Sequence, residues 1–221
     1  MPVVVSVVGT SKVGKTTFLE KLIPELRRRG YRIGTIKHDV HDSFTLDQEG
    51  KDTWRHGQAG AQTVAISSPS RIGLTKQVRE ELSLDALAAL YFQDEDLVLT
   101  EGYKGGNRPK IEICRKERQT QPLCTEKDGL VAVVSDFPTG GGLPCLPLED
   151  VGRVADFIEE RFLKDRSEPK LVVRLDGKKL PMKSFVKDFV MGGILGMISA
   201  LRGYGEPSRV DITIRIKRSP P

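Results

Sequence analysis

The sequence has few of the features that typify secreted or membrane proteins. It holds three cysteines, Cys114, Cys124 and Cys145, an odd number without metal-ligand spacing, so neither a disulfide framework nor a cysteine metal site is indicated. The longest uncharged apolar run near the C-terminus, Phe189 to Leu201, has 13 residues, fewer than the ~20 that a membrane-spanning helix needs. No basic region precedes the apolar run near the N-terminus, which argues against a signal peptide. We therefore expect a cytoplasmic protein with reduced thiols and no membrane partner.

Aromatic residues are scarce, at 6%, and the net charge of +5 is modest. The positive charge is local: from Lys164 onward, 13 Lys or Arg stand against 6 Asp or Glu, a net charge of +7, whereas the remainder has 22 against 24. This asymmetry predicts domains at residues 1–166 and 167–221, with an acidic partner for the second. We do not expect nucleic acid, because the basic segment has only Phe185, Phe189 and Tyr204 as aromatics, and both phenylalanines fit a helix core.

The N-terminal segment carries the strongest motif. An apolar, β-branched run, Val3 to Val8, is followed by Gly9–Thr16, which fits G-x-x-x-x-G-K-[ST], and then by apolar residues at the spacing of one helical face. A strand, a glycine-rich loop and a helix in this order predict a phosphate loop for a nucleoside triphosphate. The candidate nucleotide-binding residues are Gly9, Thr10, Ser11, Lys12, Val13, Gly14, Lys15, Thr16 and Thr17.

Two residues of the loop have a predicted chemical role. The amine of Lys15 should reach the β- and γ-phosphates, and the hydroxyl of Thr16 should ligate Mg²⁺. Proteins of this class also place an acidic residue at the end of another parallel strand, to hold the metal or its water. Glu101, which follows the apolar strand from Asp96 to Thr100, is the candidate; a plain surface residue at a strand end is the alternative.

The rest of the first domain alternates strands and helices. Further strands are expected at 31–38, 63–67, 71–75, 109–115, 130–136 and 143–148, and helices at 83–91 and 151–163. We predict an α/β fold of the P-loop NTPase type, a mainly parallel twisted sheet with helices on both sides. The polar stretch from Asp39 to Gly60 reads as loop with one helical turn near its end. Within it, His38 and His41 with Asp39 and Asp42 form either a metal cluster or, as we favour, solvated or phosphate-facing side chains.

Several segments together resemble one family, the adaptor proteins of molybdopterin-guanine dinucleotide biosynthesis, called MobB. The resemblance covers about Val3 to Leu163. It is carried by Gly14-Lys15-Thr16-Thr17, Leu22-Ile23-Pro24, Ile36-Lys37-His38, Gly50-Lys51-Asp52-Thr53 with Ala59-Gly60-Ala61, Glu101-Gly102-Tyr103-Lys104 and Ala132-Val133-Val134-Ser135-Asp136.

The resemblance implies a GTP-binding protein with Mg²⁺, usually a homodimer, and at most a slow GTPase whose catalytic residues would be Lys15 and Glu101. It implies partnership with molybdopterin guanylyltransferase and other molybdenum cofactor proteins. It also implies that Lys37, Asp47 and the Gly50–Thr53 stretch lie near the triphosphate as a mobile segment. Lys12 departs from the family pattern, which has a small residue there; its side chain should point outward or touch phosphate.

Guanine recognition has the weakest basis, because the chain has no Asn-Lys-x-Asp motif. The carboxylate of Asp136, at a strand end, could accept from the guanine ring N1–H and the exocyclic amine. It could equally be a simple strand-end cap.

The resemblance does not cover the second domain. Asp176-Gly177 between two short apolar runs predicts a hairpin, followed by a helix from Met182 to Leu201 and an alternating strand from Val210 to Lys217. The helix carries a small-residue stripe, Gly192, Gly196 and Ala200, which we expect to pack on the domain's own sheet.

Two other functions compete with the adaptor. A P-loop kinase of a small metabolite would need an arginine-bearing lid, and Arg55, Arg108 and Arg115 are the available arginines. A regulatory module whose basic domain senses a pterin or another anion is the third interpretation.

Overall fold

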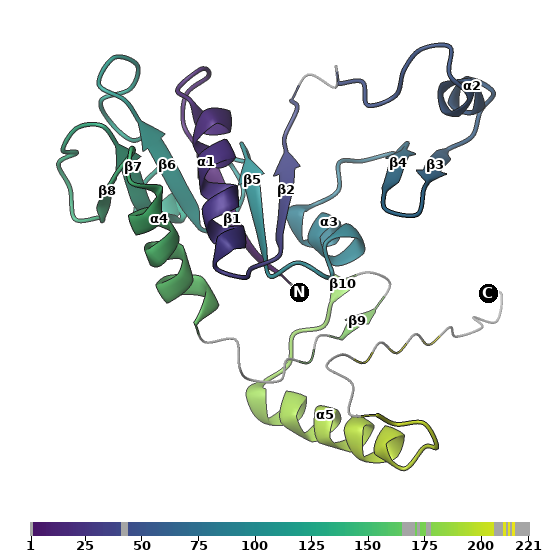
Figure 1. Ribbon diagram of the computed structural model, residues 1–221. Helices are drawn as coiled ribbons and strands as arrows, with labels where there is room; N and C mark the ends of the chain where they lie inside the picture. Colours follow the sequence, from purple (N-terminus) through teal and green to yellow (C-terminus); the bar gives the residue numbers. More distant parts are fainter. Residues whose placement is uncertain are drawn as a thin grey trace. The chain divides into compact units, whose positions relative to one another are not determined.

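A computed structural model describes residues 2–40, 44–164, 171, 173–175, 178–205, 210, 212 and 214. The chain divides into two compact units, Met1–Arg166 and Ser167–Pro221. The first unit contains the phosphate loop and a six-stranded sheet, and the second contains a strand pair and a helix (Figure 1).

The sheet of the first unit is parallel at every pairing, which confirms the predicted fold class. Because the strands are parallel, their carboxyl ends meet at one edge, where ligands bind in sheets of this type. β1 and β2 belong to the same sheet, as the sequence predicted, but β5 lies between them. In spatial order the strands are β2 (Ile33–Lys37), β5 (Leu97–Glu101), β1 (Val3–Val8), β6 (Lys110–Cys114), β7 (Leu130–Ser135) and β8 (Cys145–Pro147).

Helices cover both faces of this sheet, as expected from its alternating side chains. α1 (Lys15–Arg28) and α4 (Val151–Ile158) pack together on one face, against side chains such as Val5. α3 (Leu84–Tyr91) packs on the other face, against Val4. Figure 1 shows α1 and α4 side by side across the sheet. The first unit also has two short helical turns. One is a 3₁₀ turn at Glu126–Asp128, and the other is a π-helical turn at Glu159–Leu163 that continues α4.

A separate group of elements follows β2 in the chain. β3 (Thr63–Ser67) and β4 (Ile72–Lys76) form an antiparallel pair outside the main sheet, and α2 (Asp52–Gln58) precedes them. We call residues 44–80 the arm. Figure 1 shows α2, β3 and β4 as a group beyond β2. The arm thus leaves the sheet at the edge where β2 ends.

The second unit contains the predicted hairpin strands and helix. β9 (Arg174–Leu175) and β10 (Lys178–Lys179) pair antiparallel, and α5 spans Ser184–Ser199. The Asp176-Gly177 turn lies outside the described residues, as does most of the strand expected at 210–217. None of the helices in the described part of the chain is long and apolar enough to cross a membrane.

The expected packing of α5 was wrong. Phe185 and Phe189 are 77% and 74% exposed rather than core residues. Ala200 is exposed, and a Cβ added at Gly192 or Gly196 would meet nothing within 4 Å among the described residues. Within the part of the second unit that the structure describes, β9 and β10 have 2 residues each, and so short a strand pair can cover little of a 16-residue helix.

Candidate functional site

The loop Gly9–Thr16 joins β1 to α1 and adopts the backbone shape that its glycines permit. Gly9 and Gly14 have φ angles of 143° and 101°, which side-chain-bearing residues rarely adopt. A Cβ on Gly9 would lie 2.8 Å from the carbonyl oxygen of Ile113, so strand β6 presses closely on the loop. Val13 is fully buried beneath the loop in the main core. The turn is therefore fixed by packing on one side and left open on the other.

Lys15 folds its side chain back over this loop. Its Nζ donates hydrogen bonds to the carbonyl oxygens of Thr10 at 2.7 Å and Gly9 at 3.3 Å. Burial is the main cause that lowers the pKa of Lys15, and the nearby ammonium groups of Lys104 and Lys37 lower it further, while Glu101 raises it. The amine is thus held above the loop in a region of converging positive charge, as a polyphosphate site requires.

Glu101 lies beside the loop because β5 is the neighbour of β1, with Val7 opposite Glu101. The hydroxyl of Thr16 donates toward its two carboxylate oxygens, at 2.9 and 3.0 Å. A hydroxyl and a carboxylate at this distance are the oxygen ligands that Mg²⁺ prefers. The structure therefore brings together the two residues that the sequence assigned to the metal.

Lys37, on strand β2, lies beside the same site. It ends β2 and pairs in register with Glu101, and its side chain is exposed. Together with Lys104, which follows β5, it adds positive charge next to Lys15. Lys104 was not among the predicted site residues, although it stands in the Glu101–Lys104 motif.

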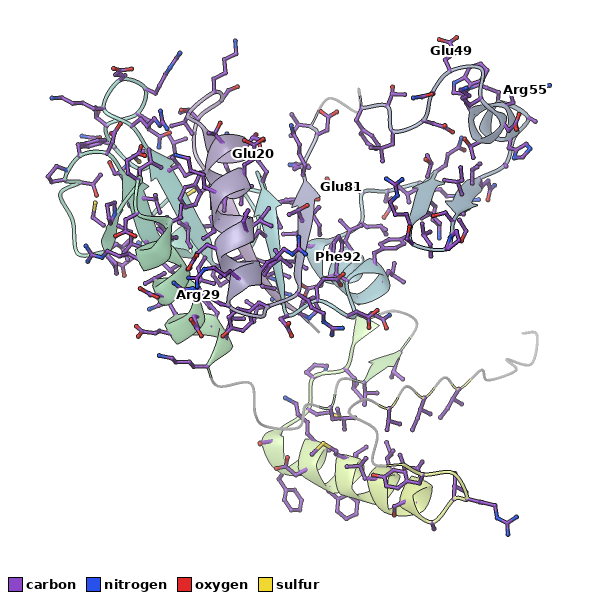
Figure 2. All side chains as sticks on the ribbon, viewed as in Figure 1. Glu20, Arg29, Glu49, Arg55, Glu81 and Phe92 are labelled. Atoms are coloured by element: carbon purple, nitrogen blue, oxygen red, sulfur yellow. The ribbon has the colours of Figure 1, made fainter. Side chains whose placement is uncertain are left out.

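The turn after Glu101 connects the site to the base of the arm. Gly102 and Tyr103 both have positive φ angles, 102° and 60°. The Tyr103 ring stacks on His38, with ring centroids 4.3 Å apart, and burial raises the pKa of Tyr103. His38 Nε2 lies 3.0 Å from a carboxylate oxygen of Glu81, a residue that Figure 2 labels. His38 precedes the arm and Glu81 follows it, so this contact ties the two ends of the arm together.

Asp136 lies at the same sheet edge, on the other side of β1. Its Oδ1 accepts a hydrogen bond from the backbone N–H of Lys116 at 2.9 Å, and the residue is exposed. This contact is that of a strand-end cap between β7 and β6. The second carboxylate oxygen is not part of the contact, so the cap and the base-reading roles are compatible.

Asp47 lies in the arm. Its Oδ1 accepts from the Thr53 hydroxyl at 2.8 Å and from the Gln48 backbone N–H at 2.9 Å. It lines an arm pocket of about 220 Å³ together with Trp54 and Phe44. Asp47 and Thr53 thus contact each other, and both of these hydrogen bonds of Asp47 are to residues of the arm rather than of the phosphate loop.

Each of the remaining predicted residues is either exposed at or next to the loop or lies outside the described part of the chain. Ser11, Lys12 and Thr17 are exposed, and Lys12 has a left-handed φ of 61°. The alternative metal cluster around His38 includes His41 and Asp42, which lie outside the described residues. Across the residues described, no group of three or more metal-ligand side chains comes together.

A buried polar network beside the loop was missed by the sequence argument. Gln119 Oε1 accepts the backbone N–H of Thr10 at 2.8 Å, and Gln119 Nε2 donates to Glu112. Glu112 is fully buried in β6 and also accepts the backbone N–H groups of Leu123 and Cys124 at 2.8 and 2.9 Å. A glutamate between the two isoleucines of this strand was the available signal, whereas Gln119 has no distinguishing pattern.

These features define a class. A phosphate loop between the first strand and helix of a parallel sheet, with a carboxylate from the adjacent strand on the loop threonine, is the arrangement of P-loop NTPase-like proteins. The family model described as "Molybdopterin guanine dinucleotide synthesis protein B" matches residues 4–136. The chain belongs to this family, MobB.

Individual relatives agree. The chain is 39% identical over 154 residues to the molybdopterin-guanine dinucleotide biosynthesis adapter protein of Haemophilus influenzae, covering 69% of this chain and 85% of that one. It is 38% identical over 159 residues to the Escherichia coli adapter protein, covering 70% and 90%. A putative adapter protein of Methanocaldococcus jannaschii is 24% identical over 238 residues, covering 97% and 98%.

Solved structures are similar as well. A crystal structure of molybdopterin-guanine biosynthesis protein B has a TM-score of 0.58 at 32% identity, over 72% of this chain and 97% of that one. The crystal structure of Bacillus subtilis MobB has a TM-score of 0.56 at 29% identity, over 72% and 97%. This agreement supports the fold of the first unit.

Proposed function

We propose that this chain is a GTP-binding adaptor in the synthesis of the molybdopterin-guanine dinucleotide form of the molybdenum cofactor, with at most a slow Mg²⁺-dependent GTPase activity. One observation carries the proposal: in a member of the MobB family, Lys15 and the Thr16–Glu101 pair converge at the phosphate loop. The relatives' names supply the pathway, and the loop supplies the nucleotide chemistry.

The proposed ligand is GTP with Mg²⁺. Loop backbone N–H groups and the start of α1 would cradle the phosphates, and Lys15 would neutralise the β- and γ-phosphates. Thr16 and Glu101 would hold Mg²⁺, which neutralises polyphosphate charge when bound. Lys37 and Lys104 surround this end of the loop, so the charge of a triphosphate matches the site.

Titration calorimetry with Mg²⁺-GTP and Mg²⁺-ATP tests the nucleotide. We expect wild type to bind GTP more tightly than ATP, and Lys15→Ala to lose measurable binding. The matched control is Lys21→Ala on the exposed side of the same helix, where the lysine makes a 3.6 Å surface ion pair with Glu149; this variant should bind as wild type does. Equal or tighter ATP binding would overturn the guanine assignment and favour the kinase alternative.

The guanine preference is proposed to rest on Asp136. The carboxylate oxygen that does not accept from Lys116 would accept the ring N1–H and the exocyclic amine. Hydrogen bonds to charged groups are worth about 1.5–3 kcal/mol, so Asp136→Asn should reduce the GTP-to-ATP affinity ratio about 10- to 100-fold. An unchanged ratio would leave Asp136 only as the strand-end cap.

The kinase alternative needs arginines gathered over the phosphates. Arg108 forms an ion pair with Asp85, and Arg55 is exposed on α2. Arg108 is therefore paired with a carboxylate, and Arg55 belongs to the arm rather than to the phosphate loop. Formation of a phosphorylated metabolite from GTP or ATP would be the observation in its favour.

The proposed partner is the enzyme that joins GMP to molybdopterin, a molybdopterin guanylyltransferase. An adaptor should associate with it in a nucleotide-dependent way. We expect co-purification of the two proteins in the presence of Mg²⁺-GTP, and much less with Lys15→Ala. Retention of the guanylyltransferase by the lysine variant at wild-type level would contradict a nucleotide-controlled adaptor.

A homodimer through the arm is also proposed. An isolated two-stranded hairpin is marginally stable in water, and the β3–β4 pair exposes Ile66, Ile72 and Leu74 at 62%, 77% and 42%. Ile72 and Leu74 lie on one face of the pair, opposite Ser67 and Ala65, and a second copy of the hairpin packed on this face would cover them. Light scattering should show a wild-type dimer, a shift to monomer for Ile72→Lys, and a dimer for the control Gln48→Lys, at an exposed position of the arm outside the hairpin. Dimeric Ile72→Lys would place the interface elsewhere.

A further inference from the structure

The turn that follows β6 lies directly beside the phosphate loop. The backbone N–H of Gln119 donates to the carbonyl oxygen of Arg115 at 2.7 Å, and that of Arg118 donates to the same oxygen at 2.9 Å. The Gln119 side chain accepts the Thr10 backbone N–H at 2.8 Å. The turn 115–119 is therefore closed on itself and attached to the start of the loop.

This attachment is anchored in the protein interior. Gln119 Nε2 donates to Glu112 and, at 3.1 Å, to the carbonyl oxygen of Gln121. Glu112 is fully buried and Gln119 is 7% exposed. Buried polar networks with every group paired hold their members in one arrangement. The position of the turn relative to the loop is thus fixed.

Arg115 extends from this fixed turn over the loop. Its Nη2, Cζ and Nε lie 3.5, 3.6 and 3.6 Å from the point that a Cβ on Gly14 would occupy. The absence of a side chain at Gly14 therefore leaves the guanidinium room to lie against the loop backbone. Gly14 is the residue just before Lys15, where the loop turns into α1.

The guanidinium has no partner within the described chain. Arg115 Nε is buried and without a hydrogen bond, and no carboxylate among the residues that the structure describes pairs with the side chain. A guanidinium stays protonated at any ordinary pH and carries five donors. Buried donors are nearly always satisfied in native proteins. A ligand with acceptor oxygens is the partner that this charge and this donor set fit.

The location of Arg115 defines which part of a ligand it meets. Glu101, which contacts Thr16, lies on β5 with Lys104 just after it, and Lys37 ends β2; both strands are on one side of β1. Arg115 follows β6, on the other side of β1, next to Asp136, which caps Lys116. A nucleotide whose metal-bound end lies by Thr16 and whose base lies by Asp136 would place its sugar-side phosphate near Arg115.

We propose that Arg115 is a nucleotide-binding residue that contacts the phosphate nearest the sugar. The inference rests on the proposed function and deepens it, because it names a group outside the loop that binds the same ligand. A guanidinium binds phosphate oxygens with two parallel hydrogen bonds. The α-phosphate is common to GTP and GDP. Arg115 should therefore strengthen the binding of both nucleotides by the same factor, unlike a residue that contacts the terminal phosphate.

Calorimetric titration of the full chain with Mg²⁺-GTP and with Mg²⁺-GDP tests this. Arg115→Met keeps the length and apolar stem of the side chain but removes its charge. We expect it to weaken both nucleotides about tenfold or more, a factor of ten being about 1.4 kcal/mol. The matched control is Arg118→Met, an exposed arginine of the same turn, which should bind both nucleotides within about twofold of wild type.

Two further readouts separate binding from folding. Thermal unfolding without nucleotide should be alike for wild type, Arg115→Met and Arg115→Lys. In ³¹P spectra of bound Mg²⁺-GDP, Arg115→Lys should shift the α-phosphorus signal and leave the β-phosphorus signal in place. This variant keeps the positive charge, so it also reports on the contact if Arg115→Met unfolds.

Wild-type affinity in Arg115→Met for both nucleotides would overturn the inference. A loss confined to GTP would overturn it too, because Arg115 would then contact the terminal phosphate. If wild type itself bound neither nucleotide, the proposed function would fail and the inference with it. These outcomes are distinct, since the first two require a wild-type protein that binds GTP.

Discussion

The hydroxyl of Thr16 lies 2.9 and 3.0 Å from the two carboxylate oxygens of Glu101. The two residues are 85 positions apart in the chain, and the register of β1 with β5 brings them together. Because both side chains offer oxygen to one point beside the phosphate loop, they define where a divalent cation would be held.

Replacing Glu101 by Gln should remove most of the benefit that Mg²⁺ gives to GTP binding. The amide keeps the size of the side chain and a hydrogen-bond contact with Thr16 but not the charge that attracts the cation. We expect GTP affinity in Mg²⁺ to fall at least about tenfold and affinity in EDTA to stay near the wild-type value. Calorimetry in the two buffers measures the difference.

The matched control for this experiment is Glu20→Gln, an exposed carboxylate on α1 that Figure 2 labels. It should leave the effect of Mg²⁺ intact. An equal loss of affinity for Glu101→Gln in Mg²⁺ and in EDTA would contradict a metal role and indicate that Glu101 only positions the loop.

Arg29 should make the first unit sensitive to acid. Its guanidinium pairs with Glu25 at 2.8 Å, Asp156 at 2.6 Å and Glu159 at 3.0 Å, and joins α1 to α4 (Figure 2). Hydrogen bonds from Arg28 and Arg29 lower the pKa of Glu25 to about 2. Hydrogen bonds from Tyr31 and Arg29 lower the pKa of Glu159.

A carboxylate whose pKa is lower in the folded state stabilises the fold above its unfolded pKa, about 4.3 for Glu. That contribution is lost as the pH falls through the folded value. We therefore expect the melting temperature to fall between about pH 4.3 and pH 2. Arg29→Met should lower stability at pH 7 and show a shallower decline, so that its curve meets the wild-type curve near pH 2. Parallel curves, or a similar effect of the exposed Arg27→Met, would contradict this assignment.

Gly34 in β2 is a packing position. A Cβ there would lie 2.4 and 2.8 Å from two ring carbons of Phe92, which Figure 2 labels at the end of α3. Gly34→Ala should therefore reduce the free energy of unfolding by about 1–3 kcal/mol, the usual cost of overpacking. Denaturant unfolding measures it. Adding Phe92→Leu should recover part of the loss, since the ring atoms are then absent.

Gly57→Ala provides the comparison for this prediction. Gly57 lies inside α2 with nothing within 4 Å of an added Cβ, and alanine is the better helix former by about 0.5–1 kcal/mol. This variant should be as stable as wild type or slightly more stable. A stable Gly34→Ala protein would show that the Phe92 ring moves aside at little cost.

Much of the first unit could be predicted from the sequence because local patterns determine it. The phosphate loop follows from two glycines and a lysine at fixed spacing, and each strand of the main sheet from its apolar run. The partnership of Thr16 and Glu101 also follows, since parallel strands end at one edge. The order of the strands across the sheet could not be predicted from these local patterns. Nothing in the sequence of β5 indicates that it lies between β1 and β2.

Contacts between residues far apart in the sequence could not be predicted either. Thr10 and Gln119 are 109 positions apart, and a glutamine in a polar turn has no pattern that indicates a buried partner. The packing of α5 was misjudged for a different reason. Its apolar residues indicated a core, but hydrophobic residues do not reveal which surface covers them, and Phe185 and Phe189 are exposed.

Removing the second unit should leave nucleotide binding intact. Every residue placed at the phosphate loop lies within Met1–Arg166, and the core on both faces of the sheet is built from that range. The Escherichia coli relative matches 70% of this chain over 90% of its own length, so a MobB protein of its length has little room for a second unit. A protein ending at residue 166 should fold.

We expect this truncated protein to bind Mg²⁺-GTP within about twofold of the full chain, because every residue to which we assign a role in nucleotide binding belongs to the first unit. Calorimetry measures the affinity, and thermal unfolding with and without nucleotide checks that the shortened chain is folded. The second unit has a net positive charge, with 11 Lys or Arg against 5 Asp or Glu in residues 167–221, so its removal should instead weaken the salt-dependent association with an acidic partner. A truncated protein that folds but binds GTP tenfold more weakly would show that the second unit supplies part of the site.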